Sequence, residues 1–170
     1  TLSEKSEFLI SIYSSVAQAE SESISSNQKW SIQKRFMNGT YILPNPAYGY
    51  CTNTNGLLEL NQKQAAVVRF IFDEYLEGNG IWRIAKSLNE QRIPTKTGKA
   101  AWLGGAIYII LKNNIYTGDL LLQKTYSEDI VPFVRRKNNG EYSQVLIEND
   151  HEPIVTHEEY EAVQRMLKQK

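Results

Sequence analysis

The side chains best suited to chemistry in this sequence are ammonium and hydroxyl groups that bind anions. The segment Thr95-Lys96-Thr97-Gly98-Lys99 holds two lysines, two threonines and a glycine. These residues offer hydrogen-bond donors on a flexible backbone, which suits the gripping of phosphate groups. A solvated surface loop has a similar composition, so the segment alone leaves both interpretations open.

Residues for metal binding, covalent catalysis or disulfide formation are sparse. The single cysteine, Cys51, excludes an internal disulfide and suits a reducing cytoplasm. His151 and His157 have no cysteine or third histidine near them, so we predict no metal and no cofactor. The serines between Ser21 and Ser31 have no base placed beside them by a motif, and we interpret them as a solvated helix face.

Charge is spread unevenly over a chain whose net charge is zero. Residues 1–28 hold one basic and four acidic side chains, residues 29–127 hold twelve and six, and residues 128–170 hold six and nine. The basic middle favours an anionic partner. The apolar runs are too short to span a bilayer and the first residues show no secretory leader, so a cytoplasmic protein is expected.

One long helix is predicted at the start of the chain. Apolar residues recur at helical spacing from Leu9 to Val16, and neither glycine nor proline precedes Gly39, where the helix should end. Thr1 with Glu4 fits a capping box, and at about 1.5 Å per residue the helix would reach roughly 50 Å. Residues 20–28 are nearly devoid of large apolar side chains, so its later half cannot pack a core of its own.

A β-hairpin is predicted after the stiff connector Pro44-Asn45-Pro46. Two extended segments, Ala47 to Thr52 and Leu57 to Leu60, flank four residues that favour turns. In this hairpin Tyr48 and Tyr50 would share one face.

Three helices are predicted next. Asn61 to Gln64 provides an N-cap and a capping box for the first, and Gly78 ends it. Ile81 to Leu88 forms the second, stopped by Pro94, and residues 103–112 form the third. The last two suggest a helix-turn-helix with a turn much longer than usual.

A small sheet and a last helix complete the expected α+β fold. Leu120 to Gln123 and Gln144 to Ile147 are predicted strands that bracket a turn at Arg135 to Gly140. Thr156 and Glu159 fit a capping box for the final helix. The predicted architecture is a long N-terminal linker helix followed by a mixed domain with a hairpin, a helix-turn-helix-like helical core and a small C-terminal sheet plus helix.

Seven short motifs, taken in order, resemble the recombinase domain of large serine recombinases, the family of phage integrases and mobile-element transposases. They are Val16-Ala17-Gln18-Ala19-Glu20, Pro46-Ala47-Tyr48-Gly49-Tyr50, Ile84-Ala85-x-x-Leu88-Asn89, Trp102, Ile107-x-x-Ile110-Leu111-x-Asn113, Tyr116-x-Gly118 and His151-Glu152-Pro153-Ile154-Val155. In the family's order and approximate spacing, they cover nearly the whole chain.

The resemblance implies that residues 1–40 are a helix linking from a catalytic domain and that residues 41–170 are a DNA-binding domain. The family's catalytic serine would precede Thr1 and its zinc ribbon would follow Lys170, so this chain alone should not cleave DNA. The parent enzyme, of bacterial, phage or mobile-element origin, would integrate or excise DNA at an attachment site and associate as a dimer or tetramer. The apolar stripe on the long helix would pack against a partner subunit or against the catalytic domain.

The resemblance also implies which residues meet double-stranded DNA. Residues 103–112 would lie in the major groove, with Ile107, Ile110 and Leu111 facing inward and few polar side chains facing the bases. Arg135 and Arg136 contact phosphate or solubilise a turn, and Trp82 and Trp102 are interpreted as core or helix-packing residues. The predicted DNA-binding residues are Lys29, Lys34, Arg35, Thr95, Lys96, Thr97, Lys99, Leu103, Gly104, Tyr108, Lys112, Arg135 and Arg136.

Two other functions fit parts of the sequence. A helix-turn-helix transcription regulator would use the long helix to dimerise. A protein-interaction module would dock a basic partner through the acidic ends of the chain and would need no nucleic acid. Binding of random duplex DNA that weakens with salt is expected of a recombinase domain and of a transcription regulator, but not of a protein-interaction module.

Overall fold

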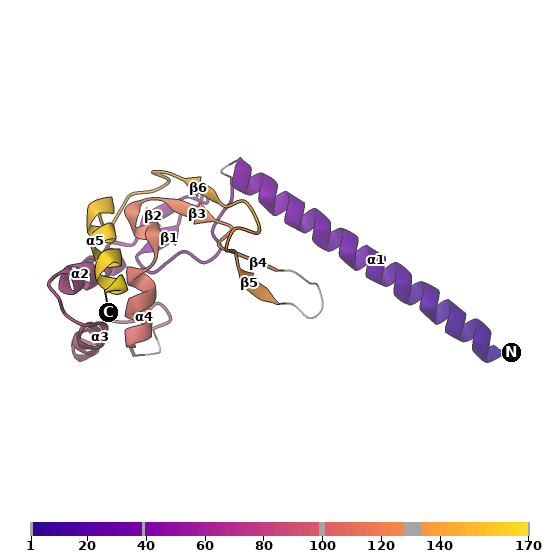
Figure 1. Cartoon of the computed structure of the whole chain (residues 1–170), viewed down its shortest axis with the longest axis horizontal. Helices are drawn as coiled ribbons and strands as arrows, with labels where there is room; N and C mark the ends of the chain where they lie inside the picture. Colours follow the sequence, from indigo (N-terminus) through magenta and orange to yellow (C-terminus); the bar gives the residue numbers. More distant parts are fainter. Residues whose placement is uncertain (1, 39, 99–100, 128–133, 170) are drawn as a thin grey trace. The chain divides into compact units, whose positions relative to one another are not determined.

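The structure is a computed structural model that describes residues 2–38, 40–98, 101–127 and 134–169, with side chains from residue 5 onward (Figure 1). Within these ranges the chain forms five α-helices, one short 3-10 helix and six strands, which confirms the predicted α+β class. The residues gather into two compact units. Unit 1 contains Thr1–Tyr41 and Leu122–Val145, and unit 2 contains Ile42–Leu121 and Leu146–Lys170.

Unit 1 begins with helix α1 (Leu2–Met37), which is continuous over 36 residues and confirms the predicted long helix (Figure 1). The helix ends just before Gly39, which lies outside the described residues, as do Thr1 and the side chains of its predicted cap. The apolar stripe on α1 is exposed to solvent rather than packed inside the described part of the chain. Its members are Leu9, Ile12, Tyr13 and Val16.

Unit 1 also contains a β-hairpin that the sequence analysis did not anticipate. Strand β4 (Thr125–Ser127) pairs antiparallel with β5 (Arg135–Lys137), and Tyr126 lies opposite Arg136. The interpretation of residues 135–137 as part of a turn was therefore wrong. The chain turns only after β5, at Asn138. The buried side chain of Asn138 donates to the carbonyls of Gln123 and Tyr142 and accepts from the backbone N–H groups of Gly140 and Tyr142.

Unit 2 opens with the predicted hairpin, formed by β1 (Tyr50–Thr52) and β2 (Leu58–Leu60) in antiparallel register. The first strand starts later than expected, because residues 47–50 form a turn in which the Tyr50 N–H donates to the Ala47 carbonyl at 3.1 Å. The second strand starts at Leu58, since the N–H of Leu57 donates to the Asn53 side chain, which closes the hairpin turn. Tyr48 and Tyr50 are both buried, but Tyr48 precedes β1, so their shared face within the hairpin stays a prediction. Helix α2 (Gln62–Leu76) follows directly.

Asn61 caps α2 as predicted, with its side chain accepting from the backbone N–H of Gln64. The predicted capping box is wrong, however, since Gln64 Oε1 accepts from the backbone N–H of Gly49 instead, at 3.1 Å. The backbone N–H of Asn61 donates to the Gly49 carbonyl. Gly49 has a φ of +104°, and a Cβ there would lie 2.9 Å from Ile154, so this contact between hairpin and helix requires glycine.

The core of unit 2 lies between helices α2, α3 (Ile81–Glu90), α4 (Gly104–Leu111) and α5 (His157–Lys168). Helices α2, α3 and α4 bury apolar side chains at helical spacing, and α5 contributes Val163. Thr156 and Glu159 form the predicted capping box of α5. The fully buried aliphatic side chains are Val68, Ile71, Ile84, Leu88, Ile107, Leu111 and Val163.

Three of the motifs meet in one buried cluster beside these helices. The Tyr116 hydroxyl, in the 3-10 helix η1 (Asn114–Thr117), donates to the Tyr48 carbonyl at 2.9 Å. Tyr50 donates to the Glu152 carbonyl, and a ring nitrogen of buried His151 lies 2.6 Å from the Ile115 carbonyl oxygen. These motif residues therefore hold the fold together.

The remaining strands, β3 (Leu120–Leu122) and β6 (Val145–Ile147), pair with each other at the predicted positions. Within the described ranges no helix is long and apolar enough to cross a membrane. The described histidine, cysteine and acidic side chains form no group of three that could hold a metal ion.

Candidate nucleic-acid interface

The loop that leads into α4 is pinned by Trp102. Its indole N–H donates to the Ile93 carbonyl at 2.9 Å, and its backbone N–H and carbonyl both bond the side-chain amide of Asn89, at 2.7 and 2.9 Å. Trp102 is buried, which confirms its interpretation as a packing residue. Although the turn between α3 and α4 is long, these bonds give α4 a defined start.

Helix α5 holds the other end of α4. The last carbonyls of a helix have no partner inside it and need donors from elsewhere. The Tyr160 hydroxyl donates to the Lys112 carbonyl at 2.9 Å, and the Gln164 amide donates to the Leu111 carbonyl at 2.7 Å. Helix α4 is therefore secured at both ends, which is what a surface that reads a ligand by shape requires.

The helical phase of α4 follows the prediction at most positions. Ile107, Ile110 and Leu111 are buried, while Tyr108 is 39% exposed. The Lys112 ammonium lies over the Tyr108 ring, 5.3 Å from its centroid, where a cation is attracted to the ring face. Tyr108 and Lys112 thus lie on the outward face, and their role in binding remains a prediction.

The expected outward position of Gly104 was wrong. Gly104 is buried, and a Cβ on it would lie 2.8 Å from the Trp82 ring. Trp82 of α3 therefore packs on the backbone of α4, as a helix-packing residue should, yet it is not a core residue because it is 70% exposed. Gly105 is the outward glycine, and a Cβ on it would touch nothing within 4 Å.

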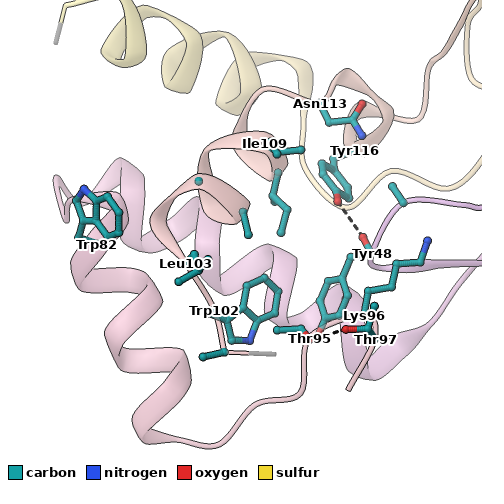
Figure 2. A pocket seen from close by; sticks show the side chains of 15 residues that line it. Tyr48, Trp82, Thr95, Lys96, Thr97, Trp102, Leu103, Ile109, Asn113 and Tyr116 are labelled. Atoms are coloured by element: carbon teal, nitrogen blue, oxygen red, sulfur yellow. Dashed lines mark hydrogen bonds between the residues drawn. The ribbon is translucent and has the colours of Figure 1, made fainter. Parts of the chain in front are cut away.

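A groove of about 740 Å³ runs beside α4. Figure 2 shows the side chains that line it, with Trp82 on one side and Lys96 and Thr97 on the other. Most of the lining is apolar and comes from the α3–α4 loop, α4 and the Tyr48 segment. Leu103 and Ile109, which both line it, are 65% and 68% exposed. Ile107, Ile110 and Leu111 of the same segment are buried, so the exposure of Leu103 and Ile109 leaves an apolar surface that invites a partner.

The predicted phosphate-gripping loop borders the same groove. The Lys96 ammonium donates to Asn45 Oδ1 and to the Pro46 carbonyl. Thr95 and Thr97 have their hydroxyl oxygens 3.4 Å apart. An ammonium has three donors, so Lys96 keeps one for a phosphate while the other two fix its position. Lys99 lies outside the described residues.

The groove lies in the most basic part of the chain. Residues 81–114 contain six basic side chains and one acidic side chain, Glu90, whose carboxylate lies 3.7 Å from Lys86. The described basic side chains here are all exposed. They are Arg83, Lys86, Arg92, Lys96 and Lys112. Such a concentration in a chain of zero net charge marks the surface that an anion would approach.

A second basic groove lies within unit 1, with a volume of about 560 Å³. It brings together Lys29 of α1 and Arg135 of β5, two predicted sites that are far apart in the sequence. Arg135 Nε donates to Thr125 Oγ1 at 2.8 Å, which fixes the guanidinium on the hairpin. Lys34, Arg35 and Arg136 belong to the same unit.

Sequence reasoning missed the aromatic component of this second groove. Trp30 lines it and is exposed, and the Lys34 ammonium lies 5.1 Å from the centre of its ring. Tyr126 and Tyr142 line it too, with ring centroids 4.7 Å apart. The available signal was the interleaving of Trp30 with Lys29, Lys34 and Arg35 on one helix.

Comparison with known families decides the classification. The profile of the family described as Recombinase matches residues 62–170, which is most of the chain. This chain belongs to the Recombinase family. The match confirms the resemblance to the recombinase domain of large serine recombinases that the order of motifs indicated.

Individual relatives of this Recombinase-family chain agree in sequence or in fold. It is 38% identical over 72 residues to the uncharacterized protein YefB of Bacillus subtilis (strain 168), covering 42% of this chain and 24% of that protein. A structure described as a crystal structure of an LSR–DNA complex matches with a TM-score of 0.56 and 19% identity, over 84% of this chain and 38% of the other. One described as "Sequence Requirements of the Listeria innocua prophage attP site" matches with a TM-score of 0.57 and 19% identity, over 85% and 52%.

At this identity the two structures show that the fold is shared. The chain spans between about a quarter and about half of the length of these proteins. The part matched by the Recombinase profile begins at α2 and includes α4, the hairpin β4–β5 and all residues that line the α4 groove except Ala47 and Tyr48.

One basic residue of this Recombinase-family chain has a structural role. Both terminal nitrogens of Arg69 lie 2.8 Å from the Glu159 carboxylate oxygens, linking α2 to α5. Arg69 also bonds Asp73. The hydrogen bonds from Arg69 hold the pKa of Glu159 down to about 2, and the two carboxylates raise the pKa of Arg69. With its guanidinium occupied in this way, Arg69 is not a candidate for phosphate binding.

Proposed function

We propose that this chain is the DNA-binding part of a large serine site-specific recombinase and that it places the outward face of α4 against duplex DNA. The observation that carries the proposal is that α4 is secured at both ends and belongs to a segment, residues 81–114, that holds six basic side chains and a single acidic one. Structures that share the fold are described as a complex with DNA and as a study of a prophage attP site.

The test is binding of a random-sequence duplex at increasing salt, followed by fluorescence anisotropy. Each phosphate neutralised by a basic side chain releases counterions and contributes about −0.9 to the slope of log affinity against log salt concentration. If about five phosphates are neutralised, the slope should be about −4.5. An affinity that does not change with salt, or no binding at about 50 mM salt, would contradict the proposal.

The basic groove of unit 1 is proposed to grip phosphates without reading sequence. Lys29 and Arg135 line it, and phosphate contacts position a protein on DNA but carry no base information. The double variant Lys29→Ala, Arg135→Ala should weaken binding to every duplex equally and reduce the salt slope by about two. Lys5→Ala, which removes an exposed charge at the other end of α1, is the matched control and should leave the slope unchanged.

The exposed stripe of α1 supports a further proposal, that the helix packs against another helix of the full-length recombinase. Leu9, Ile12 and Val16 have no packing partner among the described residues of this chain and recur at the spacing of a helix–helix seam. Leu9→Asp with Val16→Asp in the full-length enzyme should lower its oligomeric state in analytical ultracentrifugation. An unchanged oligomer would assign the stripe to contacts within one subunit.

Strand cleavage is proposed to belong to a part of the parent enzyme outside these residues. The hydroxyls of Ser15 and Ser21 donate to the carbonyls of Ser11 and Ala17 one turn earlier in α1, a local bond that serines on a helix commonly make. Supercoiled plasmid incubated with the pure chain should therefore stay intact.

A further inference from the structure

The outward face of α4 has almost no group that can hydrogen-bond to a base edge. Its positions at helical spacing are Gly105, Tyr108, Ile109 and Lys112, with Leu103 just before the helix. Direct readout in the major groove depends on arginine, lysine, asparagine, glutamine or acidic side chains that pair with base edges. The single candidate of this kind, Lys112, has its ammonium over the Tyr108 ring.

The same face exposes aliphatic surface to water. Leu103 and Ile109 are 65% and 68% exposed, and both line the 740 Å³ groove. A surface of this composition needs an apolar partner. Lys96 lines the same groove, and residues 81–114 hold six basic side chains against the single acid Glu90, which favours an apolar partner that is part of a polyanion.

The major groove offers one apolar group, which is the C5-methyl of thymine. Resting on the proposed DNA binding by α4, we infer that Leu103 and Ile109 select thymines in the target by contact with these methyl groups. The selectivity then comes from burial of apolar surface, and base hydrogen bonds contribute little to it.

Gly105 gives the geometric support for this assignment. It is exposed and lines the groove together with Leu103 and Ile109, and the space where its Cβ would stand is empty to 4 Å. Apolar contact requires heavy atoms to approach within about 4.0–4.5 Å. The missing side chain at Gly105 allows the helix backbone to come close to the base edges, so that aliphatic side chains of moderate length reach the methyl groups.

The experiment removes the methyl groups without changing the protein. Duplexes that bind this chain are first selected from a randomised pool, and each thymine in the selected core is then replaced by deoxyuridine, which lacks only the C5-methyl. At one or more positions the affinity should fall about fourfold, the factor expected for burial of one methyl-sized group. At those positions a C·G pair should bind as weakly as the uracil duplex, and 5-methylcytosine should restore the affinity.

Protein variants identify the contact. Ile109→Ala and Leu103→Ala should each abolish the difference between thymine and deoxyuridine at one position, and both should fold, because the two side chains are exposed. Leu57→Ala removes an equally exposed leucine from the turn of the β1–β2 hairpin and should keep the difference.

The outcomes separate the two proposals. Salt-dependent binding with equal affinity for the thymine and deoxyuridine duplexes at every position would overturn the inference and leave DNA binding standing. A failure to bind any duplex at low salt would overturn the proposed function itself. A thymine preference that survives in both the Leu103 and the Ile109 variants would also overturn the assignment to these side chains.

Discussion

The groove beside α4 and the groove of unit 1 differ in the chemistry that they expose. The α4 groove is lined mainly by apolar side chains, with Lys96 as its one basic lining residue among those described, whereas the unit 1 groove combines Lys29 and Arg135 with the ring of Trp30. Apolar groups on a rigid helix can distinguish base edges, while cations and aromatic rings attract a nucleic acid of any sequence. The difference suggests that selectivity and general affinity reside in separate parts of the chain.

The comparison depends on α4 being held rigidly. Variants of Trp82 and Trp102, the tryptophans that contact α4 and the loop before it, test this, and one of them has the largest effect on stability that we expect. Trp102→Ala should lower the free energy of unfolding by about 3–5 kcal/mol, because a buried ring and the indole hydrogen bond to the Ile93 carbonyl are lost. Trp82→Ala should cost less than about 1 kcal/mol, since most of that ring is in solvent. Urea unfolding measures both variants, and similar losses would mean that Trp82 anchors α4 as strongly as Trp102.

Tyr108 and the lysines of the α3–α4 loop test the distinction between selectivity and general affinity inside unit 2. Tyr108→Ala should cost about 1–3 kcal/mol of binding free energy on the selected site and almost nothing on scrambled DNA. Lys96→Ala with Lys99→Ala should weaken both duplexes alike and reduce the salt slope by about one per lost contact. If Tyr108→Ala weakens both duplexes and lowers the melting temperature, Tyr108 is a packing residue and base readout lies elsewhere.

Sequence patterns predicted the structure correctly where the interactions that determine it are local. The inward positions Ile107, Ile110 and Leu111 of α4 and the caps at Asn61 and Thr156 depend on residues within one or two turns, and they were predicted correctly. The side-chain amide of Gln64 was misassigned because its partner, Gly49, lies across the fold in the hairpin. Gly104 was misplaced for the same reason, since the ring that buries it comes from α3.

In the candidate sites, too, features set by local interactions could be predicted, and features set by distant segments could not. Strand β5 is a run of three basic residues with no strand-forming pattern, and its existence depends on pairing with β4. The proximity of Lys29 and Arg135 depends on that hairpin and could not be inferred from either segment alone. The outward position of Tyr108, by contrast, follows from the helical period of the neighbouring isoleucines. The division of function between residues 1–40 and 41–170 remains a prediction.

The ion pair that joins α2 to α5 behind α4 predicts a moderate dependence of stability on pH. The hydrogen bonds from Arg69 hold the pKa of Glu159 at about 2 in the folded chain, below its usual 4.5. A carboxyl with a lowered pKa stabilises the fold fully above its unfolded value, and this contribution is lost as the pH falls from about 4.5 toward 2. Glu159 is about a third exposed, so the contribution is screened by solvent to about 1 kcal/mol.

Glu159→Gln isolates this contribution. The variant should be less stable than the natural chain at about pH 7, and the difference in melting temperature should shrink as the pH is lowered toward about 3. Lys86→Ala, which breaks an exposed pair with Glu90, should change the melting temperature little at either pH. A constant difference between the Glu159 variant and the natural chain across this range would show that the Arg69 pair does not set the pH dependence.

Gly105→Ala has the smallest expected effect on stability. It separates folding from binding, because it should raise the melting temperature and lower the affinity for the selected duplex. Alanine is a better helix former than glycine by up to about 1 kcal/mol, and the added Cβ would meet no atom of the chain within 4 Å, so the melting temperature should rise. If the α4 backbone approaches the base edges closely, the same methyl group separates Leu103 and Ile109 from the thymines, and affinity for the selected duplex should fall several-fold while affinity for scrambled DNA stays unchanged. A variant that is more stable and binds the selected duplex at least as well would show that the DNA does not approach α4 at Gly105. The proposed contrast between a base-selective groove in unit 2 and a phosphate-binding groove in unit 1 would then lose its geometric support.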